Sequence, residues 1–266
     1  MLHIIIVSHN HDDYIIALIN MIHKQQGEGF IIYVKDNVNS KYLQDFCTVK
    51  NITYLRSDVR VGFARNNNLV VNYIRETRKV SDNDYFLFVN PDVLMGLNVI
   101  DEINKAVEKH NYDMFTIDLY KNLDMSVRDP SVRKFPKLSN FLTSYILGFN
   151  NSIIDRSDIS KPLHVDWCAG SFLGVKAEVF EKLKGFDENF FMYCEDLDLC
   201  MRARQSGFTL YYLPEIKAIH FCQNENRKLI SKNFIWHLKS IAYIYWKRVC
   251  TGLLAKKNFN LSDKNG

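Results

Sequence analysis

Short apolar runs alternate with stretches of helical periodicity through the first 95 residues, and this alternation limits what the chain can fold into. Parallel strands need a crossover between them, so strand-length runs separated by amphipathic stretches are typical of a mainly parallel sheet. The predicted strands are residues 3–7, 30–34, 51–56 and 84–89, with helices at 13–24 and 69–77 and a glycine-containing loop at 60–68. We therefore expect an α/β fold with a Rossmann-like central sheet flanked by helices.

Polar side chains follow three of the predicted strands at the point where each strand ends. Ser8 and Asn10 follow the first strand, Asp36 and Asn37 the second, and Asn90-Pro91-Asp92 the fourth. In open parallel sheets, ligands bind beyond the carboxyl ends of the strands. The sequence therefore predicts one crevice to which several strand ends contribute polar groups.

Composition narrows the class of protein. With 266 residues, 47% of them apolar, the chain can bury one large domain, or one domain with a C-terminal appendage. A net charge of +4 is too small to indicate a nucleic-acid partner. Six cysteines without metal or disulfide spacing, no basic leader and no run of roughly 20 apolar residues predict a cytoplasmic, non-spanning protein. Residues 150–160, which are polar between two apolar stretches, are the predicted mobile loop.

Two of the strand-end motifs are compatible with a nucleotide. A carboxylate at Asp92 could ligate a hard divalent cation that takes its other oxygens from a diphosphate. The alternative is a plain Asn-Pro turn. The loop around Gly62 and Asn66 could present a helix N-terminus to phosphate or ribose oxygens, or it could simply be a glycine turn with an asparagine cap.

Acidic residues are concentrated in "FFMYCEDLDLCMR", residues 190–202. A helix beginning near Glu195 accounts for part of this concentration, since acids favour a helix N-terminus, and Asp198 can pair with Arg202 four residues on. Glu195 and Asp196 remain as two adjacent carboxylates behind an apolar run. Burial and mutual repulsion raise a carboxylate's proton affinity, which suits a general base.

The stretch "WCAGSF", residues 167–172, offers a possible sugar site. Trp167 has a flat face that suits a sugar ring, and Gly170 would let the backbone approach a ligand. The alternative is a core strand whose glycine marks a bulge.

These motifs, taken in order, resemble the family 2 inverting glycosyltransferases with the GT-A fold, and among them the bacterial rhamnosyltransferases of O-antigen and related polysaccharides. The resemblance extends from Leu2 to about Lys247. Its carriers are "VSHN", "DN" at 36–37, "VGFARNNN" at 61–68, "NPD" at 90–92, "SVRKFP" at 131–136, "WCAGSF", "GFDENFFMYCEDLDLCMR" at 185–202 and "AIH" at 218–220.

The resemblance implies roles for particular residues. Asp196 is the expected catalytic base, with Glu195 beside it, and Asp92 and His220 are the expected ligands of a Mg²⁺ or Mn²⁺ ion. The expected nucleotide-sugar contacts are Ser8, Asn10, Asp36 (to the nucleobase), Asn37, Gly62, Asn66, Asn90, Asp92 and Arg202. The expected acceptor contacts are Trp167, Gly170, Ser171 and Arg133, with Lys134 as a further candidate. Many relatives carry Asp-x-Asp where this chain has Asn90-Pro91-Asp92, so one potential carboxylate ligand is an amide.

The expected reaction is a single inverting displacement that moves L-rhamnose from dTDP-β-L-rhamnose to a lipid-linked N-acetylglucosamine acceptor. Two alternatives remain, namely another nucleotide sugar such as a UDP-linked hexose or galactofuranose, and a non-catalytic nucleotide-sugar-binding module. A nucleotidyltransferase would need a glycine-rich basic loop after the first strand, and a dinucleotide oxidoreductase a G-x-G-x-x-G motif. The sequence has neither.

The C-terminal segment 231–249 has helical periodicity with two candidate faces. One arc, predicted to pack on the protein, comprises Phe234, Ile235, Leu238, Ile241, Ala242, Tyr245 and Val249. The other interleaves Lys232, Lys239 and Lys247 with Trp236, Tyr243 and Trp246, and suits the inner face of the cytoplasmic membrane. The alternative is that these rings pack on the protein or on a second subunit. We expect a catalytic domain at 1–222, with its donor part at 1–95 and its acceptor part at 96–222, and a helical extension at 223–266.

Overall fold

The central feature of the fold is a nine-stranded mixed sheet, seen in a computed structural model that describes residues 1–25, 28–136, 152–221 and 232–250. The strand order is β3-β2-β1-β4-β10-β6-β11-β5, and β8 pairs with β11. Strands β1 to β4 run parallel to one another. Strand β10 is antiparallel to both β4 and β6, β11 is parallel to β6, and β5 is antiparallel to β11.

The parallel half confirms the predicted alternation. Its strands are β1 (Leu2–Ser8), β2 (Phe30–Asp36), β3 (Thr53–Leu55) and β4 (Tyr85–Val89), and its helices are α1 (Asp12–His23), α2 (Lys41–Val49) and α3 (Phe63–Thr77). The register of β1 sets Ser8 opposite Asp36 at the end of β2. Two strand ends that were predicted to share a crevice are therefore adjacent.

The second half completes the sheet and adds a small ribbon. Its elements are β5 (Val93–Met95), α4 (Val99–His110), β6 (Met114–Tyr120), β8 (Leu163–Val165), β10 (Phe172–Lys176), α6 (Ala177–Lys182), α7 (Glu195–Gln205) and β11 (Leu210–His220). Strands β7 (Val132–Arg133) and β9 (Trp167–Cys168) pair antiparallel as a separate ribbon. The predicted strand start at "WCAGSF" is thus two strands, β9 and β10, with Gly170 between them.

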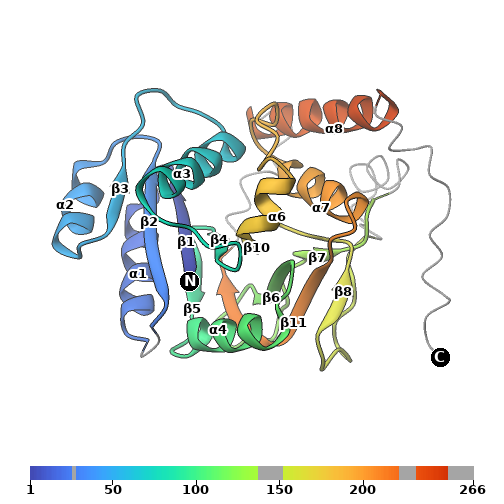
Figure 1. Cartoon of the computed structure of the whole chain (residues 1–266), viewed down its shortest axis with the longest axis horizontal. Coiled ribbons are helices and arrows are strands. Elements are labelled where there is room, and N and C mark those ends of the chain that lie inside the picture. Colours follow the sequence, from blue (N-terminus) through green and yellow to red (C-terminus); the bar gives the residue numbers. More distant parts are fainter. Residues whose placement is uncertain (26–27, 137–151, 222–231, 251–266) are drawn as a thin grey trace.

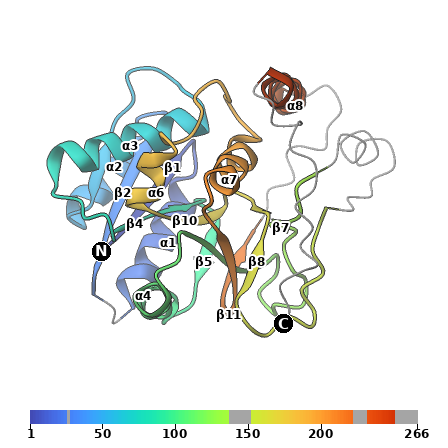
Figure 2. The same ribbon diagram turned by 45° about the vertical axis from the view of Figure 1, so that its right-hand side comes forward.

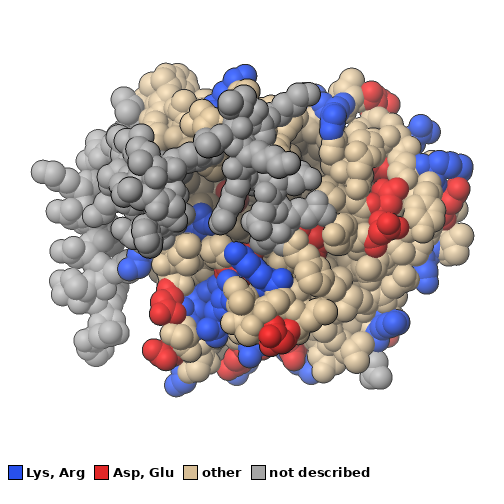
Figure 3. Space-filling view, turned by 180° about the vertical axis from the view of Figure 1, so that it is seen from behind, with Lys and Arg blue, Asp and Glu red and all other residues tan. Residues whose placement is uncertain are grey.

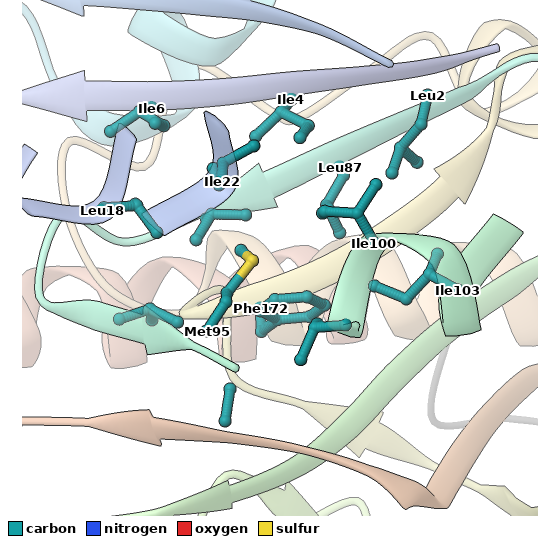
Figure 4. Close-up of a cluster of buried hydrophobic side chains, with 14 of the residues drawn as sticks. Leu2, Ile4, Ile6, Leu18, Ile22, Leu87, Met95, Ile100, Ile103 and Phe172 are labelled. Atoms are coloured by element: carbon teal, nitrogen blue, oxygen red, sulfur yellow. The ribbon is translucent and has the colours of Figure 1, made fainter. Parts of the chain in front are cut away.

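Helices cover both faces of the sheet (Figures 1 and 2). One buried cluster joins α1, α2 and α4 to side chains such as Ile4 and Leu87, as Figure 4 shows for part of it. The other cluster joins α3, α6 and α7 to alternate side chains such as Ile5 and Phe88. Because both faces are covered, the strands are continuous apolar runs rather than alternating ones.

Helix α3 begins earlier than predicted. The asparagine-rich stretch 63–68, which was expected to be a loop, forms the first turns of the helix. Asn66 Nδ2 donates to the carbonyl of Gly62 (3.0 Å), and Asn67 Nδ2 donates to that of Phe63 (2.9 Å). These side-chain bonds to the backbone, together with burial of Asn66 and Asn67, outweigh the low helix propensity of asparagine.

The segment predicted to be a mobile loop is anchored where it is described. Arg156 is 2% exposed and its Nη1 lies 3.2 Å from Asp118 Oδ1. Its other terminal nitrogen donates to the carbonyl of Asp129. Residues 150 and 151 lie outside the described residues.

The C-terminal helix α8 (Lys232–Cys250) packs beside α7 with only part of the predicted face (Figure 2). Ile241 and Tyr245 pack on the protein as predicted, together with Ile244, which was not predicted. Ile235 and Leu238, expected to pack on the protein, are each 46% exposed, whereas Lys247, expected to face lipid, pairs with Asp187 and Asp198. A helix with apolar residues almost all round has no unique buried face, and the ion pairs of Lys247 fix its rotation. The side chains of Lys232 and Val249 lie outside the described residues.

No helix in the described part of the chain has the length and apolar character needed to span a membrane. The division of the chain at residue 222 remains a prediction.

Candidate active site

The candidate site lies at one edge of the sheet, where β1, β4 and β11 end and β10 begins. Asn90, directly after β4, donates its backbone N–H to the carbonyl of Ser171, directly before β10 (2.9 Å). Its side-chain Nδ2 lies 3.4 Å from His220 Nε2 at the end of β11. Antiparallel pairing of β10 with β4 thus brings "WCAGSF" to the end of β4, where Phe172 lies opposite Val89 although Phe172 is 83 positions further along the chain.

Asp92 and His220 lie together, as the resemblance implied. His220 Nε2 lies 3.3 Å from Asp92 Oδ1, and the N–H of Phe221 donates to the carbonyl of Asp92 (3.0 Å). Burial raises the pKa of Asp92, but the hydrogen bond and charge of His220 outweigh burial and hold that pKa below its ordinary value.

Asp129 completes this cluster and was not found by sequence reasoning. Its Oδ2 lies 3.2 Å from His220 Nδ1, and the residue is 4% exposed. An ionised carboxylate only accepts hydrogen bonds, so Asp129 keeps a proton on His220 Nδ1. Nε2 then donates to Asp92 when His220 is protonated and can ligate a cation when His220 is neutral. The available signal was an acid inside the turn "RDPS", next to the family-like "SVRKFP".

The donor set fits a divalent cation only in part. No group of three His, Cys, Asp or Glu side chains in the described ranges is arranged to hold a metal ion by itself. Asp92 Oδ1 and His220 Nε2 nevertheless converge on one point, and Mg²⁺ or Mn²⁺ in nucleotide sites typically completes its shell with water and phosphate oxygens. Two protein ligands therefore suffice for a site shared with a diphosphate.

Asp196 lies in the first turn of α7 and faces this edge. Its Oδ2 accepts the backbone N–H of Gly170 (2.8 Å), and its Oδ1 accepts that of Leu197 (2.7 Å). Burial raises the pKa of Asp196 above its ordinary value, while those two hydrogen bonds and the charge of Arg133 limit the rise. A half-buried carboxylate whose pKa is moved towards neutrality is suited to accept a proton.

Glu195 occupies a more apolar environment than its neighbour. It is 6% exposed, and its Oε2 has no hydrogen-bond partner within the described residues. Burial, and then the charge of Asp196, raise the pKa of Glu195 well above its ordinary value. Burial and repulsion therefore favour the protonated form of Glu195 more strongly than that of Asp196.

Asp36, expected to contact a nucleobase, is held within its own turn. Its carboxylate is completely buried and accepts hydrogen bonds from Val38 N, Ser40 N and Tyr54 Oη (3.0, 2.7 and 2.8 Å). These bonds shape the turn after β2, and contact of Asp36 with a nucleobase remains a prediction. The next residue, Asn37, bonds the backbone of Val61 in both directions (2.8 and 3.1 Å) and links this turn to the Gly62 loop.

Gly62 is required by a close approach. A Cβ there would lie 2.1 Å from the carbonyl oxygen of Phe191, which accepts the N–H of Phe63 (2.9 Å). The donor loop is therefore in direct contact with the segment that precedes Asp196.

Arg202 is bonded to its own chain. Its guanidinium bonds Asp198 Oδ2 (2.7 Å) and the carbonyls of Leu183 and Gly185 (2.5 and 2.9 Å). The predicted Asp198–Arg202 pair is confirmed. These contacts hold α7 against the α6 end, and the expected contact of Arg202 with the nucleotide sugar remains a prediction.

The predicted acceptor residues gather around the β7–β9 ribbon. The guanidinium of Arg133 lies over the ring of Trp167, 4.9 Å from its centroid, and Gly170 packs against Phe63 and Asp196. Lys134 is exposed, and Asn10, with φ of 62°, is exposed after β1. A separate hollow of about 270 Å³ between α3 and α6 contains none of the predicted site residues, so we place the site at the strand ends.

Some of the buried polar atoms that lack hydrogen-bond partners among the described residues belong to the predicted site. Of 14 such atoms, five are in predicted site residues, Ser8 (Oγ), Asn66 (Oδ1), Trp167 (Nε1), Ser171 (Oγ) and Glu195 (Oε2), and nine are in other residues. Leaving a buried polar group unpaired costs roughly 1–3 kcal/mol unless a ligand or water pairs with it. These five atoms are therefore compatible with the predicted ligand site.

Charge supports a small-molecule site rather than a nucleic-acid one. The face in Figure 3 shows Lys and Arg interspersed with Asp and Glu over the described surface. Nucleic-acid-binding surfaces typically carry a continuous basic patch.

The sequence matches the family described as "Glycosyltransferase like family 2" over residues 2–238. It is 41% identical to the rhamnosyltransferase WbbL of Escherichia coli K12, over 98% of this chain and 97% of that protein. It is 29% identical to the N-acetylglucosaminyl-diphospho-decaprenol L-rhamnosyltransferase of Mycobacterium tuberculosis, over 61% of this chain and 55% of that protein.

Solved structures share the fold at low sequence identity. The mannosyltransferase PcManGT of Pyrobaculum calidifontis, solved with GDP-Man and Mn²⁺, superposes with a TM-score of 0.59 at 13% identity, covering 92% of this chain and 64% of that one. GalNAc-T7, solved with UDP, GalNAc and Mn²⁺, gives 0.64 at 12% identity, covering 91% and 47%. These likenesses establish the expected GT-A fold.

Proposed function

The chain belongs to glycosyltransferase family 2, and on that premise we propose that it transfers L-rhamnose from dTDP-β-L-rhamnose to a lipid-linked N-acetylglucosamine acceptor during cell-surface polysaccharide synthesis. The names of the two related rhamnosyltransferases support the sugar, and that of the mycobacterial one supports the acceptor.

The observation that carries the proposal is the position of Asp196. Its carboxylate is held by the N–H of Gly170 at the edge of the crevice formed by the strand ends, with a pKa raised towards neutrality by burial. A non-catalytic sugar-binding module would have no need of a base held in this way.

The reaction is a single displacement. The acceptor hydroxyl gives its proton to Asp196, its oxygen forms a bond to the anomeric carbon, and the bond from that carbon to the diphosphate oxygen breaks. The electron pair leaves with dTDP, and attack opposite the leaving group converts the β-linked donor into an α-L-rhamnoside. Protonated Glu195 adds no second negative charge beside the base, and the N–H of Gly170 keeps the base oriented.

A divalent cation, Mg²⁺ or Mn²⁺, fits beside the donor. Asp92 and His220 would hold it, and Asp129 would fix the tautomer of His220. When bound, such an ion neutralises the charge that develops on a departing diphosphate. Asn90 replaces a potential carboxylate ligand with an amide, so the protein contributes a smaller negative charge to this site than Asp-x-Asp would.

The acceptor side is formed by Trp167 and Arg133. The indole face suits a sugar ring, and the guanidinium suits a diphosphate. We further propose that the chain works in the cytoplasm at the inner face of the membrane, since a lipid-linked saccharide presents itself there.

The decisive experiment pairs a panel of nucleotide sugars with a short-chain N-acetylglucosaminyl-diphospho-lipid acceptor. Transfer from dTDP-β-L-rhamnose, with an α anomer in the product by NMR and no transfer by Asp196→Asn, is the expected result. Faster transfer from a UDP-linked hexose or galactofuranose would show that this nucleotide sugar, and not dTDP-β-L-rhamnose, is the donor. No transfer from any sugar, with nucleotide binding retained, would leave the binding-module alternative.

A further inference from the structure

The segment that leads into the catalytic helix, residues 186–194, is here named the catalytic loop. It ends with two consecutive residues in the left-handed region, Tyr193 (φ 71°) and Cys194 (φ 66°), immediately before Glu195 and Asp196. Non-glycine residues adopt this conformation at a cost and persist in it only where their surroundings impose it. The position of Asp196 therefore depends on what holds this loop.

Helix α3, in the predicted donor-binding part of the chain, holds one side of the catalytic loop. The carbonyl of Phe191 accepts the N–H of Phe63 (2.9 Å), and Asn68 exchanges hydrogen bonds with the backbone of Phe186 (2.9 and 3.0 Å). These contacts account for one side of the loop only.

The C-terminal helix α8 holds the other side. Ser240 Oγ donates to the carbonyl of Met192 (2.8 Å), and Lys247 Nζ bonds Asp187 Oδ2 in the loop and Asp198 Oδ1 in α7 (2.6 Å each). Ile244, 1% exposed, packs with Phe190, Cys194 and Leu197. The inner face of α8 thus joins the loop to the catalytic helix through polar, ionic and apolar contacts at once.

The opposite face of α8 is an exposed apolar stripe. Ile235 (46% exposed), Leu238 (46%) and Trp246 (61%) follow helical spacing, with exposed Ala242 between them and exposed Lys239 beside them. A single face with three large exposed apolar side chains is unusual for a surface that meets only water.

Charge favours a lipid surface as the occupant of this stripe. Between residues 226 and 262 the sequence contains eight Lys and Arg residues and no Asp or Glu. Of these, Lys239 is exposed beside the stripe, whereas Lys247 pairs inward with Asp187 and Asp198. An exposed lysine and a tryptophan on one apolar face, in a segment without acids, match anionic headgroups above an acyl boundary. A second copy of the chain would bring two such positive segments together, which is electrostatically unfavourable.

We propose that α8 couples a lipid surface to the base: its outer stripe binds anionic lipid, and the helix so anchored holds the catalytic loop through Ser240 and Lys247. Ser240 and Lys247 are positioning residues in this scheme. The coupling is measured as a change in the rate of glycosyl transfer, and it therefore rests on the proposed function. Sedimentation with vesicles and amide hydrogen exchange in the catalytic loop are independent of that function.

The experiment compares the full chain with and without vesicles of phosphatidylglycerol and phosphatidylcholine, using a short soluble acceptor. We expect sedimentation with the vesicles, a rise in kcat without a matching change in donor KM, and slower amide hydrogen exchange in residues 186–194. Replacing Ile235, Leu238 and Trp246 with Ser should abolish both sedimentation and the rise. The matched control replaces three exposed apolar residues outside α8, Val49, Leu97 and Leu123, with Ser and should respond like the parent.

The inner face is tested separately. Ser240→Ala with Lys247→Met should still sediment but show a kcat lower by about tenfold, without stimulation by vesicles, because a small displacement of a base is costly. Ser160→Ala with Lys161→Met, at exposed positions, is its control.

Each contrary outcome has a distinct meaning. Sedimentation of the parent without a change in kcat or exchange would overturn the coupling, and no sedimentation would overturn the lipid surface. Dimerisation lost in the Ile235, Leu238, Trp246 variant would identify a second copy as the occupant instead. No transfer from any donor would refute the proposed function alone. Amide hydrogen exchange in the catalytic loop would still report whether α8 holds that loop.

Discussion

At the scale of single residues, the pair Glu195 and Asp196 shows how neighbours acquire different chemistry. Asp196 accepts two backbone hydrogen bonds near Arg133, whereas Glu195 Oε2 is buried without a partner in the described chain. Burial moves both pKa values upward, that of Glu195 further, so a proton shared by the pair is favoured on Glu195 and the negative charge on Asp196.

Replacing the base tests its role directly. Asp196→Asn keeps the shape but cannot accept the proton, so kcat should fall by roughly 10²- to 10⁴-fold with donor binding retained. In the parent, kcat/KM should be lost on acidification at a pH above the range of an ordinary aspartate, because the pKa of Asp196 is raised. Glu108→Gln, at an exposed site, is the control. Normal turnover by Asp196→Asn would exclude it as base.

Glu195 should make stability depend on pH. Its pKa is higher in the folded state than in the unfolded chain, so its contribution is fully present below the ordinary value of 4.5 and is lost as the pH rises towards the folded pKa. The free energy of unfolding should fall by up to about 1.4 kcal/mol per pH unit in that range. Glu195→Gln should remove this slope and keep transfer activity. Urea unfolding from pH 5 to 8 measures it, and an unchanged slope would mean that Glu195 is not the group responsible.

The Asp92 and His220 pair predicts metal-dependent nucleotide binding. Asp92→Ala should abolish the increase in dTDP affinity that Mn²⁺ produces in the parent, as measured by calorimetry. Asp158→Ala, an exposed acid, should bind like the parent. If the parent binds dTDP and transfers sugar as well in chelator as with Mn²⁺, the reaction needs no cation. The amide of Asn90, in place of a carboxylate, would then explain why the site does not need a metal ion.

At the scale of elements, the site depends on contacts between segments that are remote in sequence. The Gly62 loop contacts Phe191, and β10 brings Gly170 to Asp196. None of these contacts follows from local propensity.

The contact at Gly62 has a measurable consequence. In Gly62→Ala the new Cβ would lie 2.1 Å from the Phe191 carbonyl oxygen, so the catalytic loop must shift. We expect a loss of about 1–3 kcal/mol in unfolding free energy and a lower kcat. Gly96→Ala, where the nearest atom lies 3.9 Å away, should change neither. Equal stability of both variants in urea would show that the loop yields freely.

At the scale of the whole molecule, the donor should stabilise the fold. A ligand at 100 times its Kd adds about 2.7 kcal/mol to the unfolding free energy, which for a chain of this length raises Tm by several degrees. dTDP-β-L-rhamnose should raise the Tm of Asp196→Asn as it does that of the parent, since the base is not needed for donor binding. A larger shift with a UDP-linked sugar would redirect the donor assignment.

Sequence alone predicted the strands of the parallel half of the fold, which the structure confirms, and named the candidate site residues, whose roles remain predictions. The apolar runs that become β1, β2 and β4 are buried on both faces, so their composition identifies them without tertiary information. The family motifs named Asp196, Glu195, Asp92 and His220, and the structure brings Asp92 next to His220 and Asp196 next to Gly170.

Only the tertiary structure decided the rest, because burial and hydrogen-bond partners are properties of contacts between distant segments. Asp129 is identified by its bond to His220, 91 residues away, and the bonds that hold the Asp36 carboxylate and the Arg202 guanidinium likewise appear only in the folded chain. The rotation of α8 was undetermined by its pattern, since an apolar helix offers more than one face, and the partners of Lys247 and Ile244 selected one.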